Sequence, residues 1–172
     1  MLATHRDAEN RYSIIREAVL DQVNQDFANR GEINNRVKLI DNTALTQSKN
    51  WDYSSKRRVD WDWVEGYANF KFRYPKRFEM ALWHSGKLAS LTLGRPTYTG
   101  QRMRLDLIEA CPEKPADLKV FEISLFAIGI YAETLGAHEL RIMNPINTQV
   151  RDYYARFGLT YVPAGDYLYA TL

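Results

Sequence analysis

The sequence predicts a single α/β domain in which a mixed β-sheet is flanked by helices. Residues 103–111 and 138–143 read as strands on either side of a long helical segment, about 117–135. Such a strand–helix–strand unit favours parallel pairing of its two strands. Residues 78–83 and 88–93 read as strands around a tight turn, which predicts an antiparallel hairpin. The sheet is therefore expected to contain both kinds of pair.

The composition is that of one soluble globular domain. The chain has 172 residues, of which 45% are hydrophobic and 26% charged, enough for a substantial core. The net charge of +2 gives no electrostatic case for binding nucleic acid or an anionic membrane. The lone Cys111 and three scattered histidines offer neither a disulfide nor metal-ligand spacing. With no signal-like or membrane-spanning segment, a cytoplasmic protein without a metal is expected.

The first half of the chain predicts two helices and a short strand. Apolar residues recur at spacings of three and four through residues 12–27, which indicates a helix that Gly31 ends. Residues 37–40 read as a strand, residues 42–58 as a polar loop, and residues 61–72 as a second helix.

The long strand at 103–111 has one apolar and one polar face up to its centre. Its odd positions from 103 to 107 are apolar, whereas Arg104 and Asp106 are polar. Glu109 has the opposite parity to Asp106, so we expect it on the other face of the strand. If Glu109 is buried there, it needs a polar partner.

The most informative motif follows the strand at 138–143. Asn147, Tyr154 and Gly158 occur there at spacings of seven and four. Positions seven apart share one helix face, so Asn147 is expected to begin a short helix with Tyr154 two turns along the same side. Gly158 then ends the helix, and two strands at about 159–163 and 166–171 complete the chain. From the residues alone, a capping Asn and a core Tyr explain the pattern equally well.

This motif and the order of elements resemble the GNAT superfamily of acyl-CoA-dependent N-acyltransferases. The resemblance implies one GNAT-like domain over residues 1–172, with residues 1–31 as an extra N-terminal helix. It implies a largely antiparallel sheet whose central parallel pair splays apart to admit the pantetheine arm of acetyl-CoA or another acyl-CoA. In the family, the residues matching Asn147 and Tyr154 lie beside the thioester, and the Tyr commonly protonates the leaving thiolate.

The loop before the long helix departs from the family pattern. A typical GNAT protein has Arg/Gln-x-x-Gly-x-Gly/Ala there, and its glycines let backbone amides approach the pyrophosphate at a helix N-terminus. Residues 110–120 contain no glycine, and Pro115 has no amide to donate. Lys114 and Lys119, with the free amides of residues 116–120, are the candidates to replace that loop. The candidate cofactor-binding residues are therefore Ala110, Lys114, Ala116, Leu118, Lys119, Val120, Asn147 and Tyr154.

Amine acylation needs a base, a polarised thioester carbonyl and an acid for the thiolate. The resemblance makes Tyr154 the candidate acid, with Tyr153 as the fallback. Asp106 is the candidate base, because family members often place a His or Glu on that side of the strand. The alternative is that Asp106 pairs with Arg104 across strands on a solvated face. A backbone amide near Ala110 is expected to polarise the thioester.

The acceptor side of the family fold corresponds to a segment rich in aromatic residues. These residues are suited to lining an acceptor pocket or stacking on a base, or to forming a core and a subunit interface. A homodimer is therefore one of the alternatives. The basic run at 56–58 is interpreted as a solvated loop, with contact to RNA, acidic protein or phosphate as the alternative. Cys111 is interpreted as a structural thiol. The aromatic residues are Trp51, Tyr53, Trp61, Trp63, Tyr67 and Phe70.

The function predicted by the resemblance is acyl transfer from acyl-CoA to a small-molecule or protein amine by direct attack. A non-catalytic binding or interaction module of the same fold is the alternative, favoured by the missing glycines. A factor acting on tRNA or another nucleic acid is a third interpretation, against which the near-neutral charge argues.

Overall fold

The computed structural model describes residues 2–172, with side chains from residue 4 onward. They form a seven-stranded sheet in which β4 and β5 are the single parallel pair of the described chain and the other neighbours are antiparallel. The strand order is β1-β2-β3-β4-β5-β7-β6. The strands are β1 (Asn35–Lys38), β2 (Phe78–His84), β3 (Lys87–Pro96), β4 (Arg102–Ala110), β5 (Glu139–Met143), β6 (Thr160–Val162) and β7 (Tyr167–Thr171). The predicted hairpin and the predicted parallel pair are both confirmed.

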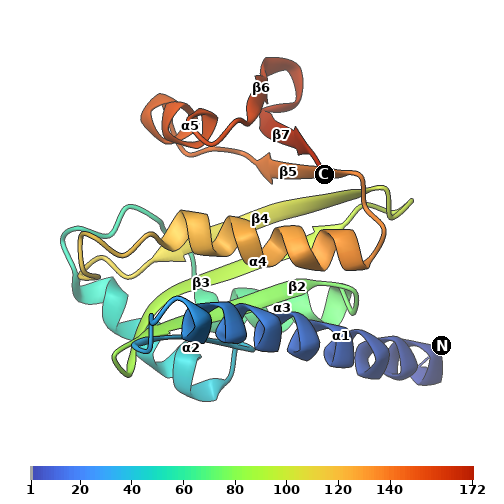
Figure 1. Cartoon of the computed structure of the whole chain (residues 1–172), viewed down its shortest axis with the longest axis horizontal. Coiled ribbons are helices and arrows are strands. Elements are labelled where there is room, and N and C mark those ends of the chain that lie inside the picture. The colour runs from blue at the N-terminus through green and yellow to red at the C-terminus, as the bar shows by residue number, and fades with distance from the viewer. Residues whose placement is uncertain (1) are drawn as a thin grey trace.

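Helices cover both faces of this sheet. Figure 1 shows α1 and α4 side by side on one face, with α2 and α3 on the opposite face. No helix of the described residues is long and apolar enough to cross a membrane. The helices are α1 (Leu2–Asn29), α2 (Asn42–Ser48), α3 (Trp63–Arg73), α4 (Val120–Thr134) and α5 (Thr148–Ala155), with 3-10 turns at Lys49–Tyr53 and Pro163–Gly165.

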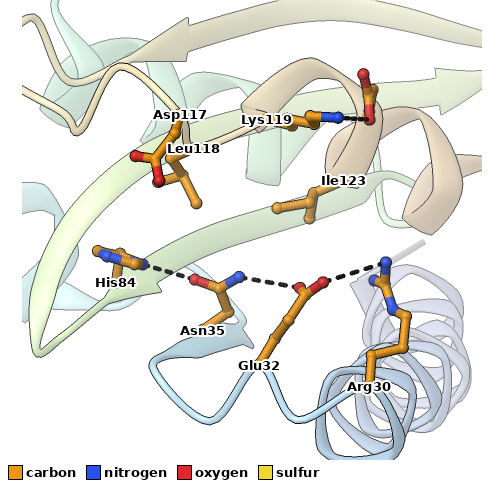
Figure 2. Close-up of a pocket in the computed structure, with 9 residues that line it drawn as sticks. Arg30, Glu32, Asn35, His84, Asp117, Leu118, Lys119 and Ile123 are labelled. Carbon is orange, nitrogen blue, oxygen red and sulfur yellow. Dashed lines mark hydrogen bonds and ion pairs between the residues drawn. The ribbon is translucent and has the colours of Figure 1, made fainter.

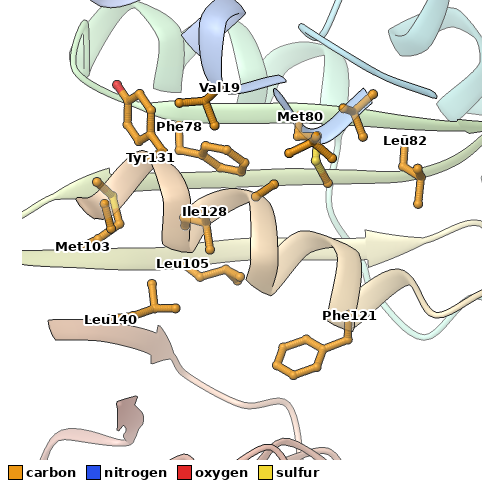
Figure 3. Close-up of a cluster of buried hydrophobic side chains, with 14 of the residues drawn as sticks. Val19, Phe78, Met80, Leu82, Met103, Leu105, Phe121, Ile128, Tyr131 and Leu140 are labelled. Carbon is orange, nitrogen blue, oxygen red and sulfur yellow. The ribbon is translucent and has the colours of Figure 1, made fainter. Parts of the chain in front are cut away.

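Two hydrophobic clusters separate these layers. The larger one lies between the sheet and the α1/α4 layer, where the Phe78 and Tyr131 rings pack at a centroid distance of 5.6 Å (Figure 3). The smaller one lies under α2 and α3 and includes Trp51, Trp63 and Tyr67. Each large side chain that is fully buried in this way stabilises the fold by about 1.5–3 kcal/mol.

The prediction of a polar loop over 42–58 is wrong for its first part. Residues 42–48 form α2, whose N-terminus is capped by Asp41 Oδ1 accepting from the Ala44 amide at 2.8 Å. Ala44 and Trp51 are buried in the smaller cluster. A short helix with one cap and one narrow apolar contact has too weak a periodicity to be distinguished from a loop in sequence.

The long α1 is tied to the sheet by a buried network of charged side chains. Arg16 Nη1 donates to the carbonyls of Pro75 (2.8 Å) and Arg77 (3.2 Å), and Arg16 Nη2 donates to Glu9 at 2.8 Å. Arg77 Nε in turn donates to Glu79 Oε1 at 2.8 Å. Because Arg16, Arg77 and Glu79 are at most 2% exposed, losing one partner would leave an uncompensated buried charge.

A β-bulge divides β4 at its centre. Leu93 pairs with Leu107 and Gly94 pairs with Leu105, so Asp106 has no partner residue on β3. An extra residue shifts the alternation of side chains, and Glu109 therefore lies on the α3 side, the same side as Asp106. The expectation that parity separates these two carboxylates is wrong.

Glu109 does have the polar partners that its burial requires. It accepts from Arg57 Nε at 2.8 Å, from Arg57 Nη2 at 3.0 Å and from Trp63 Nε1 at 2.7 Å. With both oxygens engaged, Glu109 fastens the 54–58 segment to β4.

The parallel pair separates beyond the first half of β4. The β4–β5 ladder runs from Arg102↔Glu139 to Leu105↔Ile142, whereas β4 continues to Ala110. Figure 1 shows β5 and α5 diverging from β4 and α4 beyond this point. The backbone of β4 from 106 to 110 therefore has an edge without a strand partner on the β5 side.

Candidate functional site

A cavity of about 410 Å³ lies beside this unpaired part of β4. We call it the splay cavity. Residues from β4, from the start of α4, from α5 and from two loops line it. They are Arg58, Ile108, Ala110, Lys114, Leu118, Val120, Phe121, Gln149, Val150, Tyr153 and Tyr154.

Tyr154 lies in the splay cavity, where α5 places it against α4. Its ring stacks on Phe121 with a centroid distance of 4.2 Å and an interplanar angle of 18°. Burial, and then the neighbouring Tyr153, raises the pKa of Tyr154 to about 12. Its hydroxyl has no hydrogen-bond partner among the described residues. The cavity therefore contains a phenol that stays protonated at neutral pH and is free to donate.

Asn147 begins α5 as predicted, but its side chain is used locally. Asn147 Oδ1 accepts from the Val150 amide at 2.9 Å, and Gly158 follows the helix with φ of +83°. Asn147 is exposed and does not line the splay cavity. The structure thus supports the capping interpretation of Asn147.

In the loop before α4, two of the backbone amides that were predicted to be free donors are already hydrogen-bonded. The Leu118 amide donates to the Pro115 carbonyl and the Val120 amide to the Leu118 carbonyl, both at 3.1 Å. The prediction that these two amides are free donors is wrong, because α4 begins at Val120 rather than near Asp117 and the preceding residues form tight turns. Leu118 and Val120 nevertheless line the cavity, whereas Ala116 does not.

Lys119 lies outside the splay cavity. Figure 2 shows Asp117 and Lys119 at a separate cavity of about 390 Å³, opposite His84 and Arg30. Lys119 Nζ is 3.9 Å from Glu122 Oε2. Of the two lysines predicted to assist a pyrophosphate, Lys114 alone reaches the splay cavity.

Lys114 is held in place by backbone carbonyls. Its Nζ donates to Pro115 O and to Leu118 O, each at 3.2 Å. Two donations to the adjoining loop fix the ammonium at the cavity wall. The third donor position of the ammonium is left for another acceptor.

Arg58 also lines the splay cavity, although the sequence pattern favours a solvated loop for it. The 54–58 segment crosses to the end of β4 because Ser54 Oγ donates to Glu113 at 2.9 Å and Arg57 binds Glu109. Lys56 and Arg58 are exposed, as the solvated-loop interpretation predicts, whereas the Arg57 side chain is only 11% exposed. The basic run is visible in sequence, but its destination depends on partners more than fifty residues away.

Asp106 lies at a different cavity, of about 490 Å³, against α3. Its carboxylate is 13% exposed and contacts Arg104 Nη2 at 3.0 Å and Arg95 Nε at 3.2 Å. Burial raises the pKa of Asp106, and the two arginines oppose this shift. The predicted Arg104 partner is present, although it lies on the same strand, and Arg95 is the cross-strand partner. Asp106 and Tyr154 line different cavities.

Part of the aromatic set lines this second cavity, which we call the α3 cavity. Trp61 and Phe70 lie there with the carboxylates of Asp62 and Glu65. Trp51, Trp63 and Tyr67 are core residues instead, and Tyr53 is 89% exposed. Cys111 is free and half-buried. Within residues 2–172, no group of three or more acidic, His or Cys side chains is placed to hold a metal ion.

Similar solved structures are acetyltransferases with low sequence identity. An acetyltransferase from Thermus thermophilus has a TM-score of 0.63 at 12% identity, covering 81% of this chain and 98% of that one. Ard1 from Thermoplasma volcanium has 0.57 at 8%, covering 81% and 99%. A SpeG spermidine N-acetyltransferase variant from Vibrio cholerae has 0.59 at 13%, covering 80% and 94%. No protein-family model and no curated protein matches the chain.

The likeness and the topology agree. The neighbours are matched over almost their whole length, and the single parallel pair that splays is the feature that the resemblance implied. Likeness at this level of identity establishes the architecture and leaves the reaction to the site residues. The chain therefore has the GNAT fold.

Proposed function

We propose that the protein transfers an acetyl or other acyl group from acyl-CoA to an amine by direct attack. The observation that carries this proposal is the splay cavity. A protonated, unbonded Tyr154 hydroxyl lies in it beside the part of β4 that lacks a strand partner. The proposal assigns Tyr154 as the acid and the β4 backbone near Ala110 as the group that polarises the thioester.

The splay cavity fits an acyl-CoA thioester in chemistry. Ile108, Ala110, Val120 and Phe121 present apolar surface suited to a pantetheine arm. Peptide groups along the unpaired β4 edge suit the amides of that arm, which need partners when they leave water. Acyl-CoA supplies an activated carbonyl with a thiolate leaving group.

The α3 cavity is the proposed entrance for the acceptor amine. It lies on the other face of β4, so an amine there would approach the strand opposite to the donor. Its lining has three carboxylates, Asp62, Glu65 and Asp106, against the guanidinium groups of Arg73 and Arg95. This excess of one negative charge, with the Trp61 ring, favours an organic cation over an anion. One similar fold is a spermidine N-acetyltransferase, which agrees with a cationic acceptor. Small-molecule and protein amines both belong to this class.

The proposed step conserves atoms and protons. The nitrogen of an uncharged amine bonds to the thioester carbonyl carbon, and the carbon–sulfur bond breaks. Asp106 takes the proton that the nitrogen loses, and the departing thiolate takes the Tyr154 phenolic proton. Solvent then restores both side chains. Asp106 and Tyr154 line cavities on opposite faces of β4, so in this proposal the proton passes from the nitrogen to Asp106 by way of water.

A non-catalytic binding module of the same fold is the second candidate. The specific observations that favour it are the loop without glycines, whose Leu118 and Val120 amides are occupied, and the pairing of Asp106 with two arginines. The two guanidinium groups stabilise the charged carboxylate, which offsets part of the increase in the pKa of Asp106 that burial causes. Cytoplasmic location and a homodimer stay predictions under either candidate.

Calorimetry with acetyl-CoA and with CoA separates the two candidates. Binding at micromolar concentration, followed by thiol release in the presence of polyamines, diamines or lysine peptides, would support the transferase. No binding of either compound at millimolar concentration would overturn it and favour the binding module.

A further inference from the structure

The lining of the splay cavity is positively charged. Arg58 and Lys114 are the basic residues that line it, and its lining contains no carboxylate. Other cavities of similar size do contain carboxylates. The α3 cavity has Asp62 and Glu65, and the cavity at Lys119 has Glu32, Asp117 and Glu122. The splay cavity is thus electrostatically suited to an anion.

Neither cation is neutralised by the protein. Arg58 makes no ion pair within residues 2–172, and Lys114 contacts backbone carbonyls. The nearest acid in the loop sequence, Glu113, is engaged by Lys56 Nζ at 3.2 Å and by Ser54. Asp117 faces the cavity of Figure 2 instead. Two uncompensated cations at one cavity raise each other's free energy, and an anion between them would relieve that cost.

The amides at the start of α4 add to this potential. Phe121 and Glu122 occupy the first helical turn after Val120 and have no backbone acceptor in the described residues. Phe121 also lines the splay cavity. The positive end of a helix with free amide donors is favourable for phosphate.

We propose that Arg58 and Lys114 form a side-chain phosphate site that replaces the absent glycine loop. This inference rests on the proposed function, because the anion it would hold is the phosphate portion of acyl-CoA. A guanidinium presents a planar pair of donors that matches phosphate oxygens, and an ammonium supplies a point charge beside it. Arg58 reaches the site from the acceptor-side loop, so Ser54–Glu113 and Arg57–Glu109 act as the clamp that positions it.

The experiment measures CoA affinity of the full chain by calorimetry for three variants. Arg58→Gln and Lys114→Gln remove one charge each, and Lys119→Gln is the matched control on the same loop. Losing a charged hydrogen bond to phosphate is expected to weaken CoA binding roughly tenfold or more for the first two variants. The control is expected to bind within about twofold of wild type, since Lys119 lies outside the cavity. Arg58→Lys should recover part of the loss.

A second probe separates phosphate binding from a general structural effect. S-acetylpantetheine lacks the diphosphate and the nucleotide, so its affinity should be the same for wild type, Arg58→Gln and Lys114→Gln. The salt dependence of CoA affinity should also become shallower in the two variants, since one fewer charge contact is lost on adding salt.

The possible outcomes distinguish this inference from the proposed function. If wild type binds neither CoA nor S-acetylpantetheine, the proposed function fails and this inference with it. If wild type binds CoA and both variants match Lys119→Gln, the phosphate site is overturned while the transferase stands. Equal weakening of S-acetylpantetheine and CoA would also overturn the site, because the effect would not come from phosphate.

Discussion

Replacing Tyr154 by Phe is the most direct test of the proposed chemistry. The substitution removes the phenolic oxygen and keeps the ring that stacks on Phe121 at 4.2 Å. Because the hydroxyl has no hydrogen-bond partner among the described residues, its loss breaks no internal bond. We expect the free energy of unfolding to change by less than about 0.5 kcal/mol.

The expected kinetic effect is much larger than the effect on stability. If Tyr154 protonates the thiolate, turnover should fall roughly one hundredfold, the lower end of general acid contributions, which corresponds to about 2.7 kcal/mol in the barrier. With a pKa raised to about 12 by burial and by Tyr153, wild-type Tyr154 stays protonated through about pH 10. Its ionisation should therefore cause no fall in turnover between about pH 7 and pH 10.

The assay is release of free thiol from acetyl-CoA with saturating amine, together with calorimetric CoA affinity and a thermal melt. Affinity should change little, because the lost interaction belongs to the transition state. Tyr153→Phe is the matched control, since Tyr153 lines the same cavity and is 40% exposed. Equal turnover of wild type and Tyr154→Phe over a panel of amines would refute the assignment, and Tyr154 would then be a packing residue of α5.

Three further predictions concern the base, the bulge and the buried network. Asp106→Asn should lower turnover most above the raised pKa of Asp106, where the wild-type base is ionised. The difference should shrink as the pH falls through that pKa, and a ratio of wild-type to variant turnover that does not change with pH would argue against a base. Gly94→Ala should cost about 1–3 kcal/mol in a melt, because its Cβ would lie 2.4 Å from the Arg104 carbonyl oxygen. Gly129→Ala meets nothing within 4 Å and should be neutral or stabilising. Glu79→Ala leaves Glu9 as the single carboxylate for the two buried guanidinium groups of Arg16 and Arg77, and this excess positive charge should cost about 3–5 kcal/mol in urea denaturation.

The order of elements was predictable from sequence because it depends on local periodicity. The apolar spacing of α1, the hairpin of β2 and β3, and the strand–helix–strand unit of β4, α4 and β5 were confirmed within a few residues. Asn147 and Gly158 marked the ends of α5 through capping chemistry that involves near neighbours only. Tyr154 lies on this helix as predicted, whereas its stacking on Phe121 of α4 is a tertiary contact that the spacing did not predict.

The composition of the site depended on pairing between distant segments. Sequence alternation placed Asp106 and Glu109 on opposite faces of β4, and one bulge residue at the β3 pairing reversed this. The basic run at 56–58 gave no indication that Arg58 reaches the splay cavity, because its path is set by Glu109 and Glu113. Lys114 and Lys119 looked equivalent in sequence, yet the start of α4 directs them to different cavities.

The pattern of residues along the chain is thus sufficient to show which segments are helices and strands, and through the resemblance it indicates the GNAT topology. Those properties follow from residue spacing within about one helical turn or one strand, which is visible in the sequence. Long-range contacts alone establish which cations face the splay cavity and which carboxylates are held by arginine. Side-chain direction in a strand reverses with a single inserted residue, and a loop is directed by partners far along the chain, so neither is encoded in local spacing.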